Sequence, residues 1–211
     1  MSEDRILWGV GTSRTIRAHW ALIELNLSYK TEIIRTRTPD TETATFKSVN
    51  PRQKIPVLQD GTLTIGESAA IVTYLAESYG TEKVSLIPDN PKARAKYFEW
   101  MLFICMELDA TSLYVLRRHW SLPEIYGDSP TANKASEEYF NRMITAADKL
   151  KIPKQKYLLE TGFSGVDILM TTTLKWAIDY NQKIPNNFME YFDQMGDRSG
   201  YIAALEANKM P

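Results

Sequence analysis

The sequence predicts a two-domain α+β protein, in which a small domain of order βαβαββα precedes an all-helical domain. Three observations support this. Two short apolar segments flank Asp60-Gly61, a dipeptide typical of a two-residue β-hairpin turn. Residues 5–34 follow strand, helix and strand patterns, which implies parallel strands joined by a right-handed crossover. Beyond Pro91 the periodic segments are helical.

The first domain is expected at residues 1–80. Its strands are expected at 5–10 and 29–34, around an amphipathic helix. The threonine-rich segment that follows is weakly periodic, so we expect irregular structure with a short helix near Phe46. After the hairpin, a helical stripe of apolar residues ends at Gly80, a natural C-terminal stop. This order of elements is typical of a thioredoxin-like domain.

A polar linker with two prolines is expected at residues 81–91, and the helical domain at 92–211. Ser164 and Asp167 form a near capping box before a helix that is almost entirely apolar or threonine. That helix is expected to be the buried centre of the domain. The other helices are expected at 92–116, 133–150, 187–195 and 199–208.

Composition excludes several classes of function. The 211 residues are 44% hydrophobic with a net charge of −1, so a core can form but no basic field favours nucleic acid or anionic lipid. No apolar segment reaches the length of a membrane span, and the first residues lack a signal-peptide core. The single Cys105 and two unclustered histidines exclude an internal disulfide, a Cys-x-x-Cys pair and a metal-ligand pattern. We therefore expect a cytoplasmic protein without a metal.

The segment Gly66-Glu67-Ser68, between hairpin and helix, predicts a site for a small zwitterion. A serine at a helix start offers backbone N–H groups and a hydroxyl, which suit a carboxylate. Glu67 can hold an ammonium group. Pro56 must open the preceding strand, because proline cannot donate to a strand ladder.

Residues 55–58, Asp60-Gly61 and residues 67–71 together resemble the glutathione-binding half of a glutathione transferase. The resemblance, to the cytosolic glutathione S-transferase superfamily of bacterial theta- or beta-like type, spans nearly the whole chain. It implies a cis peptide bond at Pro56 and backbone pairing of Ile55 with the cysteinyl unit of glutathione. It also implies that Glu67 and Ser68 hold the γ-glutamyl group. Finally, it places Lys54, and also Gln53, near the glycine carboxylate.

A transferase must hold glutathione as thiolate, because a free thiol with a pKa near ~8.5 is mostly protonated at neutral pH. A hydroxyl donor or a helix N-terminus lowers that pKa. The resemblance places the donor where the first helix starts. Ser13 is the first choice, since Ser13-x-x-x-Arg17 resembles the theta-class pattern, although Thr15 replaces its proline. Arg14 stands where beta-class enzymes carry cysteine, which argues against disulfide exchange. Thr12, Arg14 and Thr15 remain alternatives, and Ser13 can instead cap the helix.

The resemblance further implies attack of the glutathione thiolate on a small apolar electrophile by a homodimer. The second substrate is expected between the domains, with Trp176 near it. The expected lining residues share one face of the long helix: Met106, Ala110, Leu113, Tyr114 and Arg117. Two alternatives stay open. One is a non-catalytic transferase-like module, and the other is a glutathione-dependent isomerase, lyase or dehalogenase on the same fold.

Overall fold

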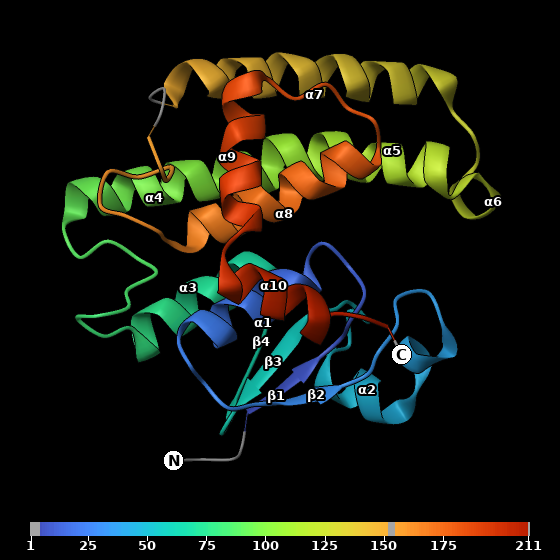
Figure 1. Cartoon of the computed structure of the whole chain (residues 1–211). Coiled ribbons are helices and arrows are strands. Elements are labelled where there is room, and N and C mark those ends of the chain that lie inside the picture. Colours follow the sequence, from blue (N-terminus) through green and yellow to red (C-terminus); the bar gives the residue numbers. More distant parts are fainter. Residues whose placement is uncertain (1–4, 152–154, 211) are drawn as a thin grey trace. The chain divides into compact units, whose positions relative to one another are not determined.

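The computed structural model describes residues 5–151 and 155–210, and the chain divides into two compact units (Figure 1). Unit 1 comprises Met1–Ile87 together with Gly196–Pro211, and unit 2 comprises Pro88–Met195. The first division falls within the predicted linker. The C-terminal segment differs from expectation, because it groups with the sheet-containing unit rather than with the helical domain predicted at 92–211.

Unit 1 contains a four-stranded sheet of order β2-β1-β3-β4. β1 pairs in parallel with β2, as the predicted crossover requires, and antiparallel with β3. The hairpin is also present, but its two-residue turn is Gly61-Thr62, one residue later than predicted, because Asp60 pairs with Leu63. Gly61 adopts the positive φ of 58° that the turn needs. The strands are β1 (Arg5–Trp8), β2 (Lys30–Glu32), β3 (Val57–Asp60) and β4 (Leu63–Gly66).

Helices cover both faces of this sheet. Trp8 and Val57 are paired across β1 and β3 and pack with Phe46 of α2 (Ala44–Val49), which follows the short η1 (Pro39–Glu42). The adjacent pair, Leu7 and Leu58, is fully buried on the opposite face because side chains alternate along a strand. That face lies toward α1 (Thr15–Glu24) and α3 (Ser68–Tyr79) (Figure 1).

The C-terminal helix α10 (Ser199–Ala207) packs against α1. The Arg198 guanidinium forms two hydrogen bonds with the Glu24 carboxylate, at 2.6 and 2.7 Å. Trp20 donates its indole N–H to the same carboxylate at 2.8 Å, and its ring lies 4.7 Å from that of Tyr201. These contacts fix the end of the chain on the first helix.

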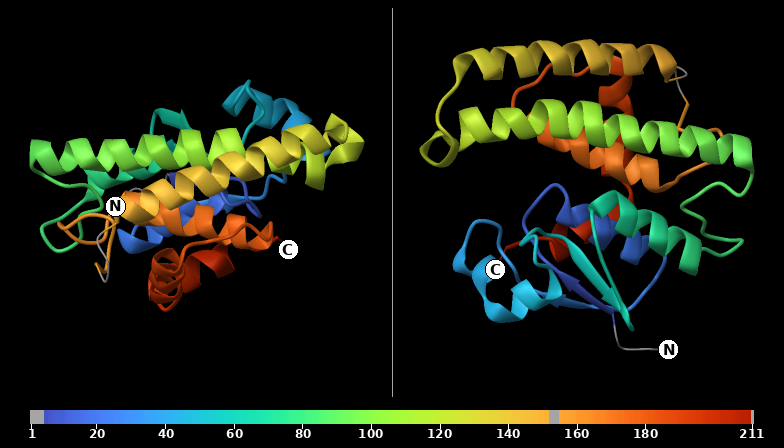
Figure 2. Two further views of the ribbon diagram at one scale, coloured as in Figure 1. Left: turned by 90° about the horizontal axis from the view of Figure 1, so that it is seen from above. Right: turned by 180° about the vertical axis from the view of Figure 1, so that it is seen from behind.

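Unit 2 is built from helices around α8 (Gly165–Asp179), whose residues from Gly165 to Leu174 are all buried, as predicted. Figure 2 shows α7 (Pro130–Leu150) running beside the long helix that begins with α4 (Pro91–Phe103). None of the helices in the described ranges is long and apolar enough to cross a membrane. The elements of this unit are α4 (Pro91–Phe103), η2 (Ile104–Leu113), α5 (Tyr114–Leu116), η3 (Arg117–Ser121), α6 (Pro123–Tyr126), α7 (Pro130–Leu150), α8 (Gly165–Asp179) and α9 (Asn186–Gly196).

The long helix departs from the prediction in its hydrogen-bond pattern. Sequence periodicity predicts one α-helix over 92–116, whereas η2 (Ile104–Leu113) within that range is π-helical, and the helix continues beyond it into the π-helical η3 (Arg117–Ser121). In η2 the Ser112 hydroxyl donates to the Glu107 carbonyl at 2.7 Å, and Tyr139 of α7 donates to the Glu107 carboxylate. A π-helix has more residues per turn, so side chains predicted to share a face at α-helical spacing diverge.

The predicted capping box begins α8. The Asp167 carboxylate accepts hydrogen bonds from the backbone N–H of Ser164 at 2.9 Å and of Leu158 at 2.8 Å. It also accepts from the Tyr191 hydroxyl of α9 at 2.9 Å. Burial nevertheless raises the pKa of Asp167 to about 6. The box therefore joins a loop and two helices of unit 2, and its role is structural, as expected.

Candidate functional site

The end of β1 and the loop before β3 approach each other closely in unit 1. Gly9 has φ +115°, and a Cβ at this position would lie 2.6 Å from Cβ of Ile55. Only glycine tolerates that conformation and that contact. The Ile55-Pro56 peptide bond is cis, as predicted. Gly9 therefore allows the first strand to place the cis peptide next to the turn that leads into α1.

Asn50, which is buried, shapes the loop that carries the predicted glutathione residues. Its side-chain amide donates to the Lys54 carbonyl at 2.7 Å, and its Oδ1 accepts from the Arg52 N–H at 3.1 Å. The side chains of Gln53 and Lys54 are left exposed. Among the hydrogen bonds of the described residues, none uses the N–H or carbonyl of Ile55. An extended peptide backbone can pair with such free groups.

Glu67 and Ser68 lie together at the start of α3, as predicted. Glu67 has φ 67° and ψ 113°, a sparsely populated region for a residue with a side chain. Its exposed carboxylate lies 3.3 Å from the Arg52 guanidinium. Arg52 also covers Gly66, where a Cβ would lie 2.5 Å from Nη2. Arg52 is absent from the sequence prediction, because a lone arginine in a polar loop carries no pattern.

Arg17 connects the starts of α1 and α3. Its guanidinium donates to the Ser68 hydroxyl at 3.2 Å, and the residue is only 1% exposed. Its role is thus structural within unit 1. A buried cation adds to the positive end of the α3 dipole and favours an anion at Ser68.

The buried histidine of α1 does not extend this site. The His19 ring lies 2.8 Å from the Tyr29 hydroxyl, and burial lowers its pKa to about 4. It is therefore neutral at neutral pH. Within the described ranges, no group of three or more His, Cys, Asp or Glu side chains is arranged to hold a metal ion.

The turn before α1 contains the candidates for contact with the glutathione sulfur. The Thr12 hydroxyl accepts from the N–H groups of Thr15 at 3.0 Å and Arg14 at 3.3 Å, so Thr12 performs the capping expected of Ser13. Thr15 is fully buried. Ser13 is half-buried, and its hydroxyl forms no hydrogen bond with the described part of the chain. Asn208, for which no sequence pattern indicates a role, reaches this turn from the C-terminal segment.

The residues predicted to line a second-substrate pocket all belong to unit 2 and differ in exposure. Met106 is 56% exposed and Ala110 is also exposed. Tyr114 and Arg117 are half-buried, whereas Leu113 is fully buried. Leu113 and Met106 therefore differ in exposure, because the π-helical η2 does not keep residues at α-helical spacing on one face. Trp176 is buried, with its ring 5.9 Å from that of Tyr180. The pocket itself stays a prediction.

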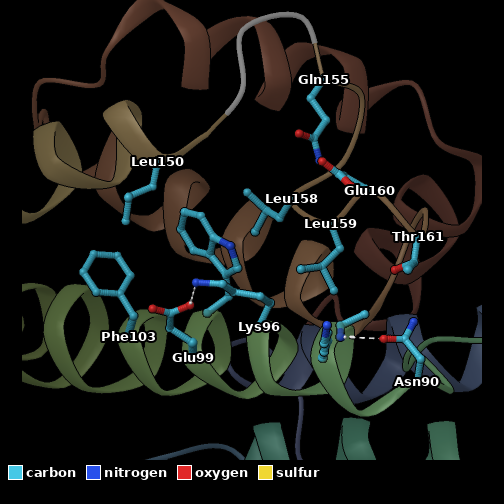
Figure 3. Close-up of a pocket in the computed structure, with 13 residues that line it drawn as sticks. Asn90, Lys96, Glu99, Phe103, Leu150, Gln155, Leu158, Leu159, Glu160 and Thr161 are labelled. Carbon is cyan, nitrogen blue, oxygen red and sulfur yellow. Dashed lines mark hydrogen bonds and ion pairs between the residues drawn. The ribbon is translucent and has the colours of Figure 1, made fainter.

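A separate cavity of about 580 Å³ lies within unit 2, between α4 and the segment 155–161 (Figure 3). Trp100, Leu158 and Leu159 supply apolar surface, and Lys96 pairs with Glu99 at 2.6 Å on its rim. None of the catalytic, glutathione-binding or second-substrate residues predicted from the sequence lines this cavity. The candidate site is therefore the group of loops in unit 1, not this cavity.

Comparison with known proteins identifies relatives. Residues 13–78 match the family described as "Glutathione S-transferase, N-terminal domain". The chain is 25% identical over 170 residues to glutathione S-transferase A of Pleuronectes platessa, covering 80% of this chain and 75% of that protein. A glutathione transferase homolog from Lodderomyces elongisporus, crystallised with two GSH per subunit, superposes with a TM-score of 0.87 at 17% identity, covering 99% of this chain and 100% of that one. A beta-etherase from a Sphingobium strain gives 0.85 at 18% identity, covering 97% and 99%. The predicted fold class is confirmed.

Proposed function

Because the chain belongs to the glutathione S-transferase superfamily, we propose that unit 1 binds glutathione and activates it for transfer to an electrophile. One observation carries this proposal. Glu67 holds an unfavourable backbone conformation beside Ser68. In the same unit, the N–H and carbonyl of Ile55, which precedes the cis bond to Pro56, form no hydrogen bond with the described residues. Strained residues of this kind persist where the surrounding structure fixes them, and they cluster at ligand sites.

The proposed binding mode uses one group for each part of the tripeptide. The backbone of Ile55 pairs with the cysteinyl unit. The Ser68 hydroxyl and the N-terminus of α3 receive the γ-glutamyl carboxylate, with the Arg17 charge behind them. Glu67 holds the ammonium group. Lys54 and Gln53, both exposed on the loop shaped by Asn50, receive the glycine carboxylate.

The proposed chemistry depends on the turn that precedes α1. The Ser13 hydroxyl donates a hydrogen bond to the glutathione sulfur and, together with the helix N-terminus, lowers the pKa of the thiol. The thiolate then attacks an electrophilic carbon. Arg14 and Thr12 are the alternative partners of the sulfur, and Thr15 is disfavoured by its complete burial.

The second substrate and the assembly are further parts of the proposal. We propose a small apolar electrophile bounded by Met106, Ala110, Tyr114 and Arg117. The proposed assembly is a homodimer, because the long helix exposes 57% of Leu102 and 56% of Met106, and water-exposed apolar side chains on one helix favour a protein contact. Light scattering measures the oligomeric state directly.

The deciding experiment is calorimetry of glutathione binding from about pH 5 to pH 9, a range that spans the pKa of a free thiol. We expect binding with proton release near neutral pH, and a shift of that release to higher pH in Ser13→Ala. S-methylglutathione, which has no thiol proton, is the matched control and should bind without this release. Absence of glutathione binding by the wild type would refute the proposal.

Turnover then separates the alternatives. Binding and thiol ionisation without any product would indicate a non-catalytic module. Cleavage of an ether or a carbon–halogen bond, or isomerisation, would indicate the other alternative, and the structural likeness to a beta-etherase makes ethers a direct test set. Conjugation of an apolar electrophile would support the transferase.

A further inference from the structure

Asn208, at the C-terminal end of α10, contacts three residues of the turn that precedes α1. Its Oδ1 accepts from the Thr15 hydroxyl at 2.6 Å and from the Gly11 N–H at 3.1 Å. Its Nδ2 donates to the Thr12 carbonyl at 3.2 Å. The Asn208 carbonyl also accepts from the Gly11 N–H, at 2.9 Å. One side chain therefore uses both its donor and its acceptor to hold this turn.

These contacts determine where the hydroxyl protons of the turn point. The single proton of the Thr15 hydroxyl has its shortest acceptor in Asn208 Oδ1. In the 3.0 Å contact between the two threonine hydroxyls, Thr12 is then the donor. Thr12 Oγ1 meanwhile accepts from two backbone N–H groups. Both threonine protons are thus used inside the turn, whereas no described residue accepts the proton of Ser13.

We infer that Asn208 is a positioning residue, which directs the Thr12 and Thr15 protons inward and so leaves Ser13 as the hydroxyl that donates to the ligand sulfur. This inference rests on the proposed function, and it selects among the sulfur partners that the sequence leaves open. Asn208 acts through the turn and has no assigned contact with glutathione.

The surrounding packing keeps Asn208 in place. The Arg198–Glu24 pair and the Trp20–Tyr201 contact anchor α10 on α1. Beyond Asn208, Met210 lies against Gly11, where a Cβ would come within 2.6 Å of its Cγ. The C-terminal segment therefore packs against the turn that precedes α1.

Two substitutions test the inference through the ionisation of bound glutathione, followed by thiolate ultraviolet absorbance against pH. Asn208→Ala removes the acceptor and the donor, so we expect a roughly tenfold smaller thiolate fraction at neutral pH with glutathione affinity within about twofold. Asn208→Leu keeps about the same size but can neither accept nor donate a hydrogen bond, so its effect should match that of Asn208→Ala. Lys209→Ala, one residue further along the segment, is the matched control and should leave ionisation unchanged.

A double-mutant cycle makes the test decisive. If Asn208 acts by presenting Ser13, Asn208→Ala should add little to the effect of Ser13→Ala. Additive effects, or unchanged ionisation in both Asn208 variants, would overturn the inference while leaving glutathione activation intact. Wild-type protein that binds no glutathione would overturn the proposed function together with this inference. If Asn208→Ala unfolds, Asn208→Leu carries the same test.

Discussion

Two helix starts in this protein use a serine and an acidic residue with opposite results. At α8, Asp167 lies within the first turn, is fully buried, and accepts hydrogen bonds from two backbone N–H groups and a tyrosine. At α3, Glu67 precedes Ser68, is exposed, and makes no capping hydrogen bond to its own helix. The geometry of the two acids decides the outcome: Asp167, three residues after Ser164, reaches back to the Ser164 N–H and closes the start of α8, whereas Glu67 with φ 67° makes no side-chain cap and leaves the start of α3 open to solvent.

The α8 start should therefore show the larger effect on stability. Asp167→Ala leaves the Leu158 and Ser164 N–H groups and the Tyr191 hydroxyl buried without their acceptor. We expect the free energy of unfolding to fall by about 4 kcal/mol, since each unsatisfied buried group costs roughly 1–3 kcal/mol. Urea unfolding measures this. Asp193→Ala, at an exposed position of α9, should change stability little, and an equal loss there would contradict the comparison.

The pH dependence of stability separates the two acids further. Burial raises the pKa of Asp167 from 3.8 to about 6, so the folded state binds a proton more tightly than the unfolded state. This contribution is fully present below about pH 4 and is lost as the pH rises through about 6. The stability of the wild type relative to Asp167→Asn should therefore fall by about 3 kcal/mol between these limits. Exposed Asp193→Asn is the control, and a wild type that gains stability relative to Asp167→Asn as the pH rises would refute the assignment.

Both helix starts could be predicted because their determinants are local in sequence. Ser164 and Asp167 are three residues apart, and Glu67 and Ser68 are adjacent, so spacing alone indicated each feature. The cis bond at Pro56 and the hairpin followed from the same stretch of chain and from the family resemblance.

The remaining features depend on contacts between distant residues. Asn208 meets the α1 turn from the other end of the chain, and Arg52 meets Glu67 across a loop. No periodicity relates such residues. The π-helical η2 differs from the prediction for another reason, because apolar spacing was interpreted with α-helical geometry. Leu113 was therefore grouped with Met106 on one helix face, although Leu113 is buried and Met106 is exposed.

The α3 start should instead govern ligand affinity. Glu67→Gln keeps the shape of the side chain but removes the charge proposed to hold the ammonium group of glutathione. We expect roughly tenfold weaker binding, in line with the loss of one charge-assisted hydrogen bond, and little change in stability. Glu77→Gln, at the far end of α3, is the matched control. Calorimetry at neutral pH gives both affinities, and equal affinities for the two variants would remove Glu67 from the site.

The smallest predicted effect tests whether the open helix start carries strain. Glu67 adopts φ 67°, which glycine accepts without penalty. Glu67→Gly should therefore leave stability unchanged or raise it by up to about 1 kcal/mol, while glutathione binding weakens at least as much as in Glu67→Gln. Glu77→Gly, in the last turn of the same helix, should lower stability by up to about 1 kcal/mol. Opposite signs for one substitution at two positions of α3 would show that the Glu67 backbone is held in place for binding at the expense of stability, whereas equal losses would mean that the turn is unstrained.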